Sequence, residues 1–225
     1  TDLKNIKSSG KILVKDAKIS HKKLPVKIDD IRSTLNLDNN KIVISDTSAI
    51  INGSKLDIVG SIDTNAKADI KISTDKLPLN VLYQAFANSD LKNAYSVDKG
   101  ELTLNAYLKG ELAEIKPIAN IDLKNLSIKD KALKATYSLD EMLSQFTIEG
   151  DEYDGEIDLK NIKASLPEFN LHINAPISKI KIDEKDIIVE PTNINIDNSK
   201  LTFDAKITDY LSKLNVDAIL KGNLS

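Results

Sequence analysis

The stretch GELTLNAYLKGEL, residues 100–112, alternates between apolar and polar side chains at almost every step. Apolar side chains take the even positions, as at Leu102, Leu104 and Leu108, and polar side chains or tyrosine take the odd positions. Successive side chains of a β-strand point to opposite faces of a sheet. The stretch therefore predicts a strand with one apolar and one polar face, and what covers the apolar face becomes the central question.

The same alternation recurs along most of the chain. It predicts about 15 to 18 short strands, joined by turns rich in Asn, Asp and Gly, and hence a mostly β fold. The alternation slips after Leu123, because Leu126 and Ile128 are apolar in the opposite register. We expect a β-bulge at Asn125, since a bulge is a common way to bend a sheet.

One segment breaks the strand pattern. In LPLNVLYQAFANSDL, residues 77–91, Val81, Leu82, Ala85 and Phe86 have helical spacing, which predicts a short helix near 78–88. Pro78 suits the first turn of such a helix. Weaker helical or turn patterns occur at 140–145 and 209–214. We expect one elongated β-rich fragment over 1–225, with a subdivision near the helix at 78–88 as an alternative.

Two parts of the sequence are similar to each other. NGSKLDIVGSIDTNAKADIKIS at 52–73 aligns with DNSKLTFDAKITDYLSKLNVDAILKG at 197–222, about 145 residues further on. Each contains a turn that ends in Ser-Lys-Leu, a strand, a polar connection and a second strand, and the connection is longer in the second copy. A repeated sheet unit is typical of elongated architectures in which each repeat contacts only its neighbours.

The composition favours an aliphatic surface over a conventional core. Hydrophobic residues make up 41% of the 225 residues, but aromatic residues only 4%, and Trp is absent. A two-layer core of this size usually contains more aromatic side chains, although a genome rich in codons for Ile, Lys and Asn would give the same bias. The net charge is −3 and its charges are interspersed, so nucleic acid is not an expected partner. There is no Cys, which excludes disulfides and thiolate chemistry.

The residue types used in catalysis and metal binding do not form a recognisable site. His21 and His172 are the only histidines and lie far apart in the sequence. The run DEYDGE at 151–156 lacks the residue order of a calcium loop. Nucleophile-elbow, P-loop and dinucleotide-binding motifs are missing. We expect no enzymatic activity, no cofactor and no metal.

Two phrases carry a resemblance to a known family. GELTLNAYLKGELAEIKPIANIDLKNLSI at 100–128 resembles the pattern of TamB and AsmA-like proteins of diderm bacteria, in which a strand ending in Gly is followed by a short link, a Pro and a strand running into x-L-x-N-L-x-I. Residues 25–82 resemble a recurring module of the same family, with G-S-x-L-x-I-x-G-x-I before A-D-I-x-I and L-P-L. The resemblance covers most of the chain, more loosely after Asp130.

The resemblance implies a bridge-like lipid-transfer protein. The TamB and AsmA-like family is similar in plan to such proteins. Its members are anchored in the inner membrane and span the periplasm, and their continuous antiparallel-type sheet curls into an open, taco-like trough with an aliphatic inner face. It implies transport of phospholipids toward the outer membrane and an Omp85-type outer-membrane barrel as a partner of the full-length protein. The sequence lacks a signal peptide and a membrane-spanning run, so we expect a fragment whose targeting and anchoring segments lie outside it.

The alternation marks the candidate lining of such a trough. We predict that it is formed by one set of alternating apolar residues: Ile58, Ile62, Ile70, Ile72, Leu102, Leu104, Leu108, Ile121, Leu123, Leu201, Phe203, Ile207, Val216, Ala218 and Leu220. The leading alternative is a structural or adhesive β-repeat in which these residues pack against each other in a closed core. A carbohydrate-binding sandwich is less favoured, because Trp is absent and aromatic residues are few.

Overall fold

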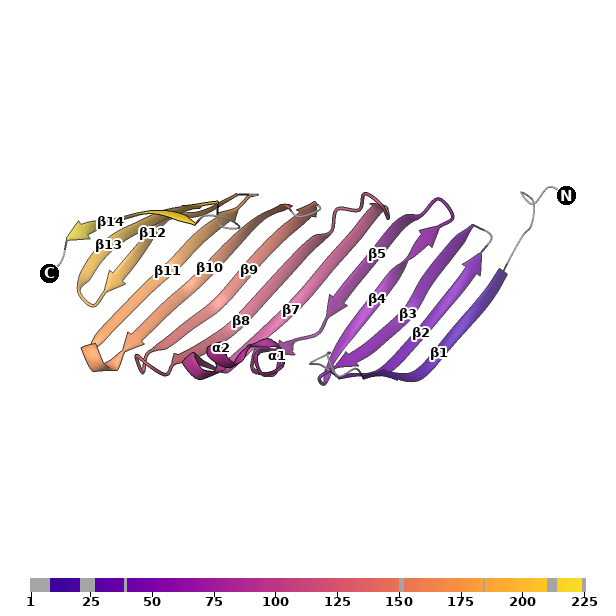
Figure 1. Cartoon of the computed structure of the whole chain (residues 1–225), viewed down its shortest axis with the longest axis horizontal. Helices are drawn as coiled ribbons and strands as arrows, with labels where there is room; N and C mark the ends of the chain where they lie inside the picture. The colour runs from indigo at the N-terminus through magenta and orange to yellow at the C-terminus, as the bar shows by residue number, and fades with distance from the viewer. Residues whose placement is uncertain are drawn as a thin grey trace. The chain divides into compact units, whose positions relative to one another are not determined.

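The structure is a computed structural model that describes residues 9–20, 27–38, 40–149, 152–183, 185–209 and 214–223. The described residues form one 14-stranded antiparallel sheet, which confirms the predicted mostly β fold with short helices (Figure 1). The strands are β1 (Ser9–Ile19), β2 (Ile28–Asp38), β3 (Lys41–Ile51), β4 (Ser54–Asp63), β5 (Lys67–Thr74), β6 (Leu77–Pro78), β7 (Tyr95–Glu111), β8 (Ile118–Asp130), β9 (Thr136–Glu149), β10 (Glu152–Leu166), β11 (Leu171–Ile182), β12 (Asp186–Ile196), β13 (Ser199–Thr208) and β14 (Asn215–Asn223).

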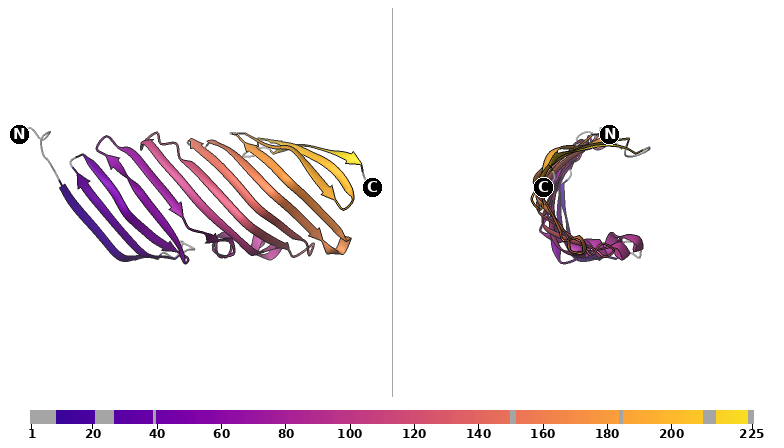
Figure 2. Two further views of the ribbon diagram at one scale, coloured as in Figure 1. Left: turned by 180° about the vertical axis from the view of Figure 1, so that it is seen from behind. Right: turned by 90° about the vertical axis from the view of Figure 1, so that its left-hand side faces the viewer.

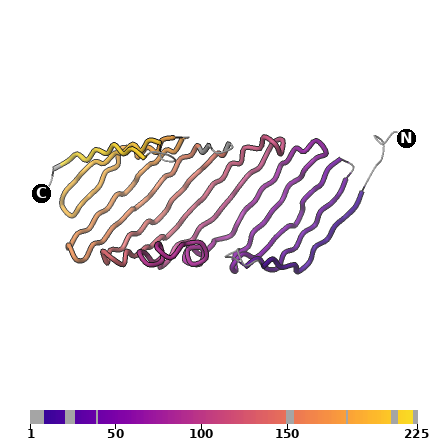
Figure 3. The backbone as a smooth tube through the Cα atoms, in the orientation of Figure 1, coloured from indigo at the N-terminus to yellow at the C-terminus, as the bar shows by residue number. Residues whose placement is uncertain are grey.

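The strands follow one another across the sheet almost in sequence order. The order is β1-β2-β3-β4-β5-β7-β8-β9-β10-β11-β12-β13-β14, and the short β6 pairs with β7 off this path. The chain therefore runs up and down as a meander, which Figure 3 traces along the backbone. Most connections between neighbouring strands are short turns, as antiparallel pairing allows.

The chain divides into two compact units. Unit 1 comprises residues 1–77 and 103–119, and unit 2 comprises residues 78–102 and 120–225. Unit 1 contains β1 to β5 and the later part of β7, whereas unit 2 contains the helices, the first part of β7 and most of β8 to β14. Each unit is described by itself below.

Residues with left-handed backbone interrupt several strands without ending them. Asp16, Asp30 and Asp46 in β1, β2 and β3 have φ values of 53°, 50° and 51°, and the strand pairing shifts register close to each of them. A bulge inserts one extra residue, so the side-chain alternation changes parity there. In β1 the apolar positions change from Ile12 and Val14 to Ala17 and Ile19, which keeps apolar side chains on one face.

Asn125 in β8 has the same backbone geometry, with a φ of 54°. Asn tolerates left-handed backbone better than other residues with a Cβ atom. The parity change after Leu123 is therefore explained by a left-handed residue within a continuous strand. Residues 118–123 and 126–128, which the alternation separates, belong to the single strand β8.

We expect Asn125→Ala to lower the free energy of unfolding by about 1 kcal/mol, because alanine is disfavoured in left-handed backbone. Asn125→Gly should leave the free energy of unfolding nearly unchanged, since glycine adopts this backbone without a steric penalty. Urea denaturation followed by far-ultraviolet circular dichroism measures both. Equal midpoints for the alanine and glycine variants would show that the left-handed backbone at this position is not a constraint.

The helix near 78–88 is confirmed as α1 (Leu79–Phe86), with Pro78 at its N-cap. A second helix, α2 (Ser89–Ala94), was not predicted; the Asn88 side chain caps it by accepting a hydrogen bond from the Leu91 amide at 2.9 Å. The only other helical element among the described residues is a 3-10 turn at Pro167–Phe169. No helix of the described residues is long and apolar enough to cross a membrane.

The helical or turn pattern at 140–145 is wrong, because these residues lie within β9. Within this strand Glu141, Met142 and Leu143 pair in succession with Lys160, Leu159 and Asp158 of β10. The segment is therefore extended and paired, and not helical. The other weak helical pattern, at 209–214, lies largely outside the described residues.

The internal repeat is visible in the structure and extends beyond the two similar stretches. β3 and β12 have the same bounds when the second is shifted by 145 residues, and so do β4 and β13. The register shift between Ile44 and Thr47 in β3 recurs between Val189 and Thr192 in β12. The two copies lie in different units, so each unit contains one copy of the same meander.

The turns of the two copies also match in their hydrogen bonds. The Asn52 amide donates to the Lys27 carbonyl at 3.1 Å, and the Asp197 amide donates to the His172 carbonyl at 3.0 Å. Asn52 and Asp197 have φ values of 47° and 48°. The repeat therefore preserves backbone detail and not only strand count.

Candidate functional site

Unit 1 has one continuous apolar face. The paired strands bring apolar residues into rows that run across the sheet. One row joins β1 to β5 and β7 through Ile12, Leu35, Ile44, Gly60, Ile70 and Leu108. A second row, beside it, contains Gly10, Leu37, Ile42, Ile62, Ala68 and Gly110.

This face is not covered by a second layer of the described residues. Figure 2 shows the strands of unit 1 as a single layer, and the main contacts of β1 to β5 are those between hydrogen-bonded neighbours. Ile12 remains 50% exposed and Ile42 39% exposed. The buried hydrophobic residues on this part of the sheet are small, such as Ala49 and Ala68. Large aliphatic side chains therefore lie on an open surface.

The opposite face of unit 1 is polar. Asp69 and Lys109 pair across β5 and β7, and Lys67 and Glu111 form an ion pair on the same two strands. The Lys71 ammonium lies 5.6 Å from the centre of the Tyr107 ring, within cation–π distance. Water is therefore the suitable environment for this face.

Unit 2 repeats the apolar face in its last strands. One row crosses β10 to β14 through Gly155, Ile182, Ile187, Ile207 and Val216. The next row contains Ile157, Ile180, Val189, Ala205 and Ala218. Val216 is 54% exposed and Leu220 is 60% exposed, so this face is open as well.

A pair of hydroxyls interrupts each apolar face at an equivalent place. Ser178 and Thr192 are buried and their hydroxyl oxygens lie 2.9 Å apart in unit 2. Ser33 and Thr47 lie 2.7 Å apart in unit 1. Because each pair is hydrogen-bonded internally, it presents little unsatisfied polarity to the apolar surface.

The predicted lining residues fall into two groups. Ile58, Ile62, Ile70, Ile72 and Leu108 lie on the apolar face of unit 1, and Leu104 continues the same alternation along β7. The group in unit 2 comprises Leu102, Ile121, Leu123, Leu201, Phe203, Ile207, Val216, Ala218 and Leu220. Of these, Leu201 to Leu220 share rows across β13 and β14, and Leu123 is a buried residue of β8.

The rows also contain residues that the prediction omitted. Ile12, Leu35 and Ile44 share a row with the predicted Ile70 and Leu108. Their alternation was visible in the sequence, but only the pairing of neighbouring strands shows that they belong to the same face.

Unit 2 contains a cavity that sequence reasoning missed. It has a volume of about 650 Å³ and lies between the two helices and the ends of β7, β8 and β9. Ten residues line it: Leu79, Leu82, Tyr83, Phe86, Ala87, Leu91, Tyr95, Val97, Ile128 and Tyr137. The apolar spacing within α1 was the available signal, because it requires an apolar partner for that helix.

Gly100 allows α1 to approach β7 closely. A Cβ atom at this position would lie 3.1 Å from the Leu79 Cβ atom and 3.5 Å from the Leu126 Cδ1 atom. Gly100 is even-numbered, like Leu102 and Leu104, and so belongs to the same alternation of β7. The first residue of α1 therefore packs on the apolar side of the sheet in unit 2, and the cavity is formed on that side.

The Tyr83 hydroxyl at the cavity is hydrogen-bonded to the protein backbone. The Tyr83 hydroxyl donates to the Leu91 carbonyl at 2.6 Å, and the Tyr95 carbonyl is 3.2 Å away. The Lys92 ammonium donates to the Gln84 carbonyl at 2.7 Å, and the Lys131 ammonium donates to the Lys92 carbonyl at 2.5 Å. The cavity wall is thus apolar, and lysines lie beside it.

Ion pairs cross the polar face of unit 2. Glu141 lies between Lys160 and Lys124, at 2.5 Å and 3.4 Å. The hydrogen bond from Lys160 holds the pKa of Glu141 below its usual value, and the same pair raises the pKa of Lys160. The hydrogen bond from Lys181 likewise lowers the pKa of Glu190. These side chains are charged at neutral pH and keep this face in water.

The candidates for metal binding remain apart. His172 is exposed and its Nδ1 atom lies 3.6 Å from the Asp197 Oδ1 atom, whereas His21 lies outside the described residues. Among the residues described, no three His, Cys, Asp or Glu side chains come together as a metal site. The first residue of the DEYDGE run, Asp151, lies outside the described residues.

Comparison of the chain with protein-family models, with curated proteins and with solved structures gave no match. The functional argument therefore depends on the two apolar faces and the cavity.

Proposed function

We propose that this chain binds the acyl chains of phospholipids along its apolar faces and shields them from water during transfer between the inner and outer membranes. The observation that carries this proposal is the uncovered apolar row across six strands of unit 1. A soluble protein rarely exposes an apolar surface of this extent unless a ligand or partner covers it. The resemblance to TamB and AsmA-like proteins supports the same function.

Aliphatic contact alone supplies enough free energy for binding. Each methylene group transferred from water to an apolar wall contributes about 0.8 kcal/mol, so a chain of 12 to 14 methylenes gains on the order of 10 kcal/mol. This gain requires no polar contact at a fixed position. A lipid on such a face is held strongly but can move along it, and its headgroup stays in water.

The bulges support a trough as the form of the lipid-bearing surface. The pairing shifts register beside the left-handed residues of β1, β2 and β3, and a bulge of this kind increases local twist and curvature. We infer that the bent sheet is an open trough whose inner side is the apolar face. The ion pairs on the opposite face suit the outer, solvated side.

The cellular context follows from the proposed function. A lipid-transfer protein of this class works in the periplasm, with the full-length protein anchored in the inner membrane and an Omp85-type barrel as an outer-membrane partner. The rival function is a structural or adhesive β-repeat whose apolar face is covered by protein. That function requires a second layer from outside the described residues, because these do not supply one.

A photocrosslinking experiment distinguishes the two functions. A photoreactive amino acid at Leu104 or Ile121 reports on the apolar side, and the same amino acid at Tyr107 or Lys109 reports on the opposite face of β7. After irradiation in cells, we expect phospholipid adducts at Leu104 and Ile121 and few at the two control positions.

Mass spectrometry of the intact protein identifies each adduct. Protein adducts at Leu104 without lipid adducts would support the closed-core function. Lipid adducts of equal yield at Leu104 and Tyr107 would contradict a lipid-specific apolar face.

A further inference from the structure

We propose that the cavity under α1 and α2 is a discrete binding site for one acyl chain of an anionic amphiphile, with Lys92 and Lys131 beside it to bind the anionic headgroup. The inference rests on the proposed function, since it assigns a lipid class to one part of the apolar surface. It goes further, because it separates a defined site from a face along which lipids slide.

The cavity wall has the composition of an acyl-chain site. Its lining is aliphatic and aromatic, and the hydroxyl of Tyr83 is turned to backbone carbonyls. Its volume of about 650 Å³ lies within the range of about 300 to 1,000 Å³ typical of small-molecule sites. The site is open to solvent, since Phe86 is 64% and Leu91 47% exposed, but unlike the rows of the sheet it has helices on one side and strands on the other.

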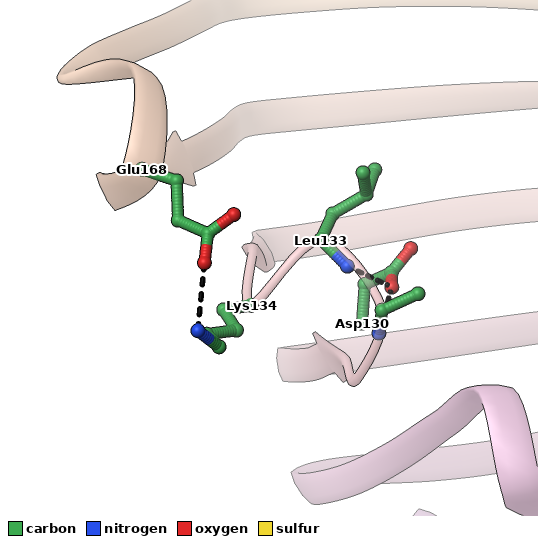
Figure 4. Close-up of polar contacts among 5 residues, drawn as sticks. Asp130, Leu133, Lys134 and Glu168 are labelled. Carbon is green, nitrogen blue, oxygen red and sulfur yellow. Dashed lines mark hydrogen bonds and ion pairs between the residues drawn. The ribbon is translucent and has the colours of Figure 1, made fainter.

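The helices over the cavity are fixed in place by several contacts. Leu79 packs against Gly100 of β7, and the Lys131 amide donates to the Ala94 carbonyl at the end of α2 at 2.9 Å. The Asn88 side chain caps α2 between the two helices. The turn after β8 is held by the Asp130 carboxylate, which accepts hydrogen bonds from the Ala132 and Leu133 amides at 2.9 Å (Figure 4). The cavity is therefore preformed.

The charges beside the cavity favour an anion. Lys92 follows the lining residue Leu91 in the sequence. Its ammonium donates to the carbonyl of Gln84, the residue after the lining residue Tyr83. Lys131 bonds the Lys92 carbonyl. An ammonium has three donors, so each of these lysines retains donors for a ligand. A phosphate or carboxylate headgroup would bind both ammoniums at once.

The nearby carboxylates are engaged elsewhere or displaced from these lysines. Asp98 forms an ion pair with Lys129 at 2.7 Å. Asp130 accepts backbone hydrogen bonds, and Glu168 pairs with Lys134 at 2.7 Å (Figure 4). Asp90 is in the first turn of α2, whereas Lys92 is in its last turn. The hydrogen bonds of the Lys92 and Lys131 ammoniums given above go to backbone carbonyls, which leave their positive charges unneutralised.

Titration with two probes of equal chain length tests the inference. Laurate carries a negative headgroup and dodecylamine a positive one, and both are used below their aggregation concentrations with the full chain. Tyr83, Tyr95 and Tyr137 line the cavity, so intrinsic tyrosine fluorescence reports on binding. We expect one saturable site, with laurate bound at least tenfold more tightly than dodecylamine.

Variants locate the site. Ala87→Trp and Val97→Phe both reduce the cavity volume and should abolish the saturable laurate site. Lys221→Trp adds bulk on the polar face of β14, where Lys221 is exposed and pairs with Thr202, and should leave the site unchanged. The double variant Lys92→Gln, Lys131→Gln should reduce the preference for laurate to less than twofold and leave dodecylamine binding intact. Circular dichroism confirms folding of each variant.

The outcomes separate this inference from the proposed function. Unchanged laurate binding in both cavity-filling variants, or equal binding of the two probes by the original chain, would overturn the cavity site or its anion preference. If those failures occur while lipid adducts form at Leu104, the proposed function stands alone. A laurate site lost in Ala87→Trp and Val97→Phe, together with protein adducts at Leu104, would retain the cavity site and contradict transfer along the face.

Discussion

Gly60→Ala is expected to destabilise unit 1 by about 2 to 6 kcal/mol. Gly60 lies in β4 with a φ of 148°, and a Cβ atom there would be 2.1 Å from the Asp69 carbonyl oxygen and 2.7 Å from the Ile70 Cα atom. The unfavourable backbone geometry costs about 1 to 3 kcal/mol, and displacing the paired strand costs about a further 1 to 3 kcal/mol. Because the contacts are to backbone atoms of β5, a change of rotamer does not relieve them.

Gly110→Ala is the matched control for this prediction. Gly110 has a φ of 132°, but a Cβ atom there would meet no other atom within 4 Å. The alanine should therefore cost only the backbone penalty of about 1 to 3 kcal/mol. Urea denaturation gives the two losses, and hydrogen exchange of the β4 and β5 amides locates the damage. Equal losses in the two variants would show that strand approach at Gly60 is not the constraint.

The effect would reach the apolar face, because Gly60 is part of the row between Ile44 and Ile70. Only a glycine lets β4 and β5 lie this close at that position. The row therefore has one gap in its aliphatic surface, at Gly60, because a side chain there would prevent the close approach of β4 and β5.

The alternation in the sequence predicted the apolar face but not the length of the strands. Asp46 and Asn125 are short polar residues, which are typical of turns, and they divide their segments into apparent short strands. In the structure they are left-handed residues inside β3 and β8. Whether such a residue ends a strand or forms a bulge depends on pairing with the neighbouring strand, which local patterns do not contain. For this reason the described residues form 14 strands where the alternation predicted 15 to 18.

Predicting the cavity would have required contacts between residues even further apart in the sequence. The spacing of Val81, Leu82 and Phe86 predicted α1, but the position of that helix depends on Gly100, about twenty residues later. The helix α2 has six residues and no clear apolar period, so it gave no periodic signal. A cavity formed by two helices and three strand ends is visible only when all five segments are placed.

The repeat, in contrast, was readable from sequence because it depends on matched residues. Ser54, Lys55 and Leu56 recur as the same three residues 145 positions later. The structure shows that this match marks the start of β4 and of β13. It also shows that the matched hydroxyl pairs occupy equivalent places on the two apolar faces.

Ile70→Asp is expected to reduce phospholipid extraction from vesicles by at least tenfold. Ile70 lies in the apolar row of unit 1, between Gly60 and Leu108. A carboxylate facing hydrocarbon without a partner costs several kcal/mol, and about 1.4 kcal/mol already corresponds to a tenfold change in binding. The measurement is the amount of fluorescent phospholipid carried by the purified chain after separation from the vesicles.

Val59→Asp is the matched control, because Val59 is an exposed β-branched residue of β4 that pairs with Lys71 on the opposite, polar face. It should leave extraction unchanged within about twofold, since a carboxylate beside a lysine in water is well solvated. Similar losses in both variants would point to a general defect of the sheet. Unchanged extraction in both would contradict lipid binding by this face. A loss confined to Ile70→Asp is expected only if acyl chains lie against one side of the sheet.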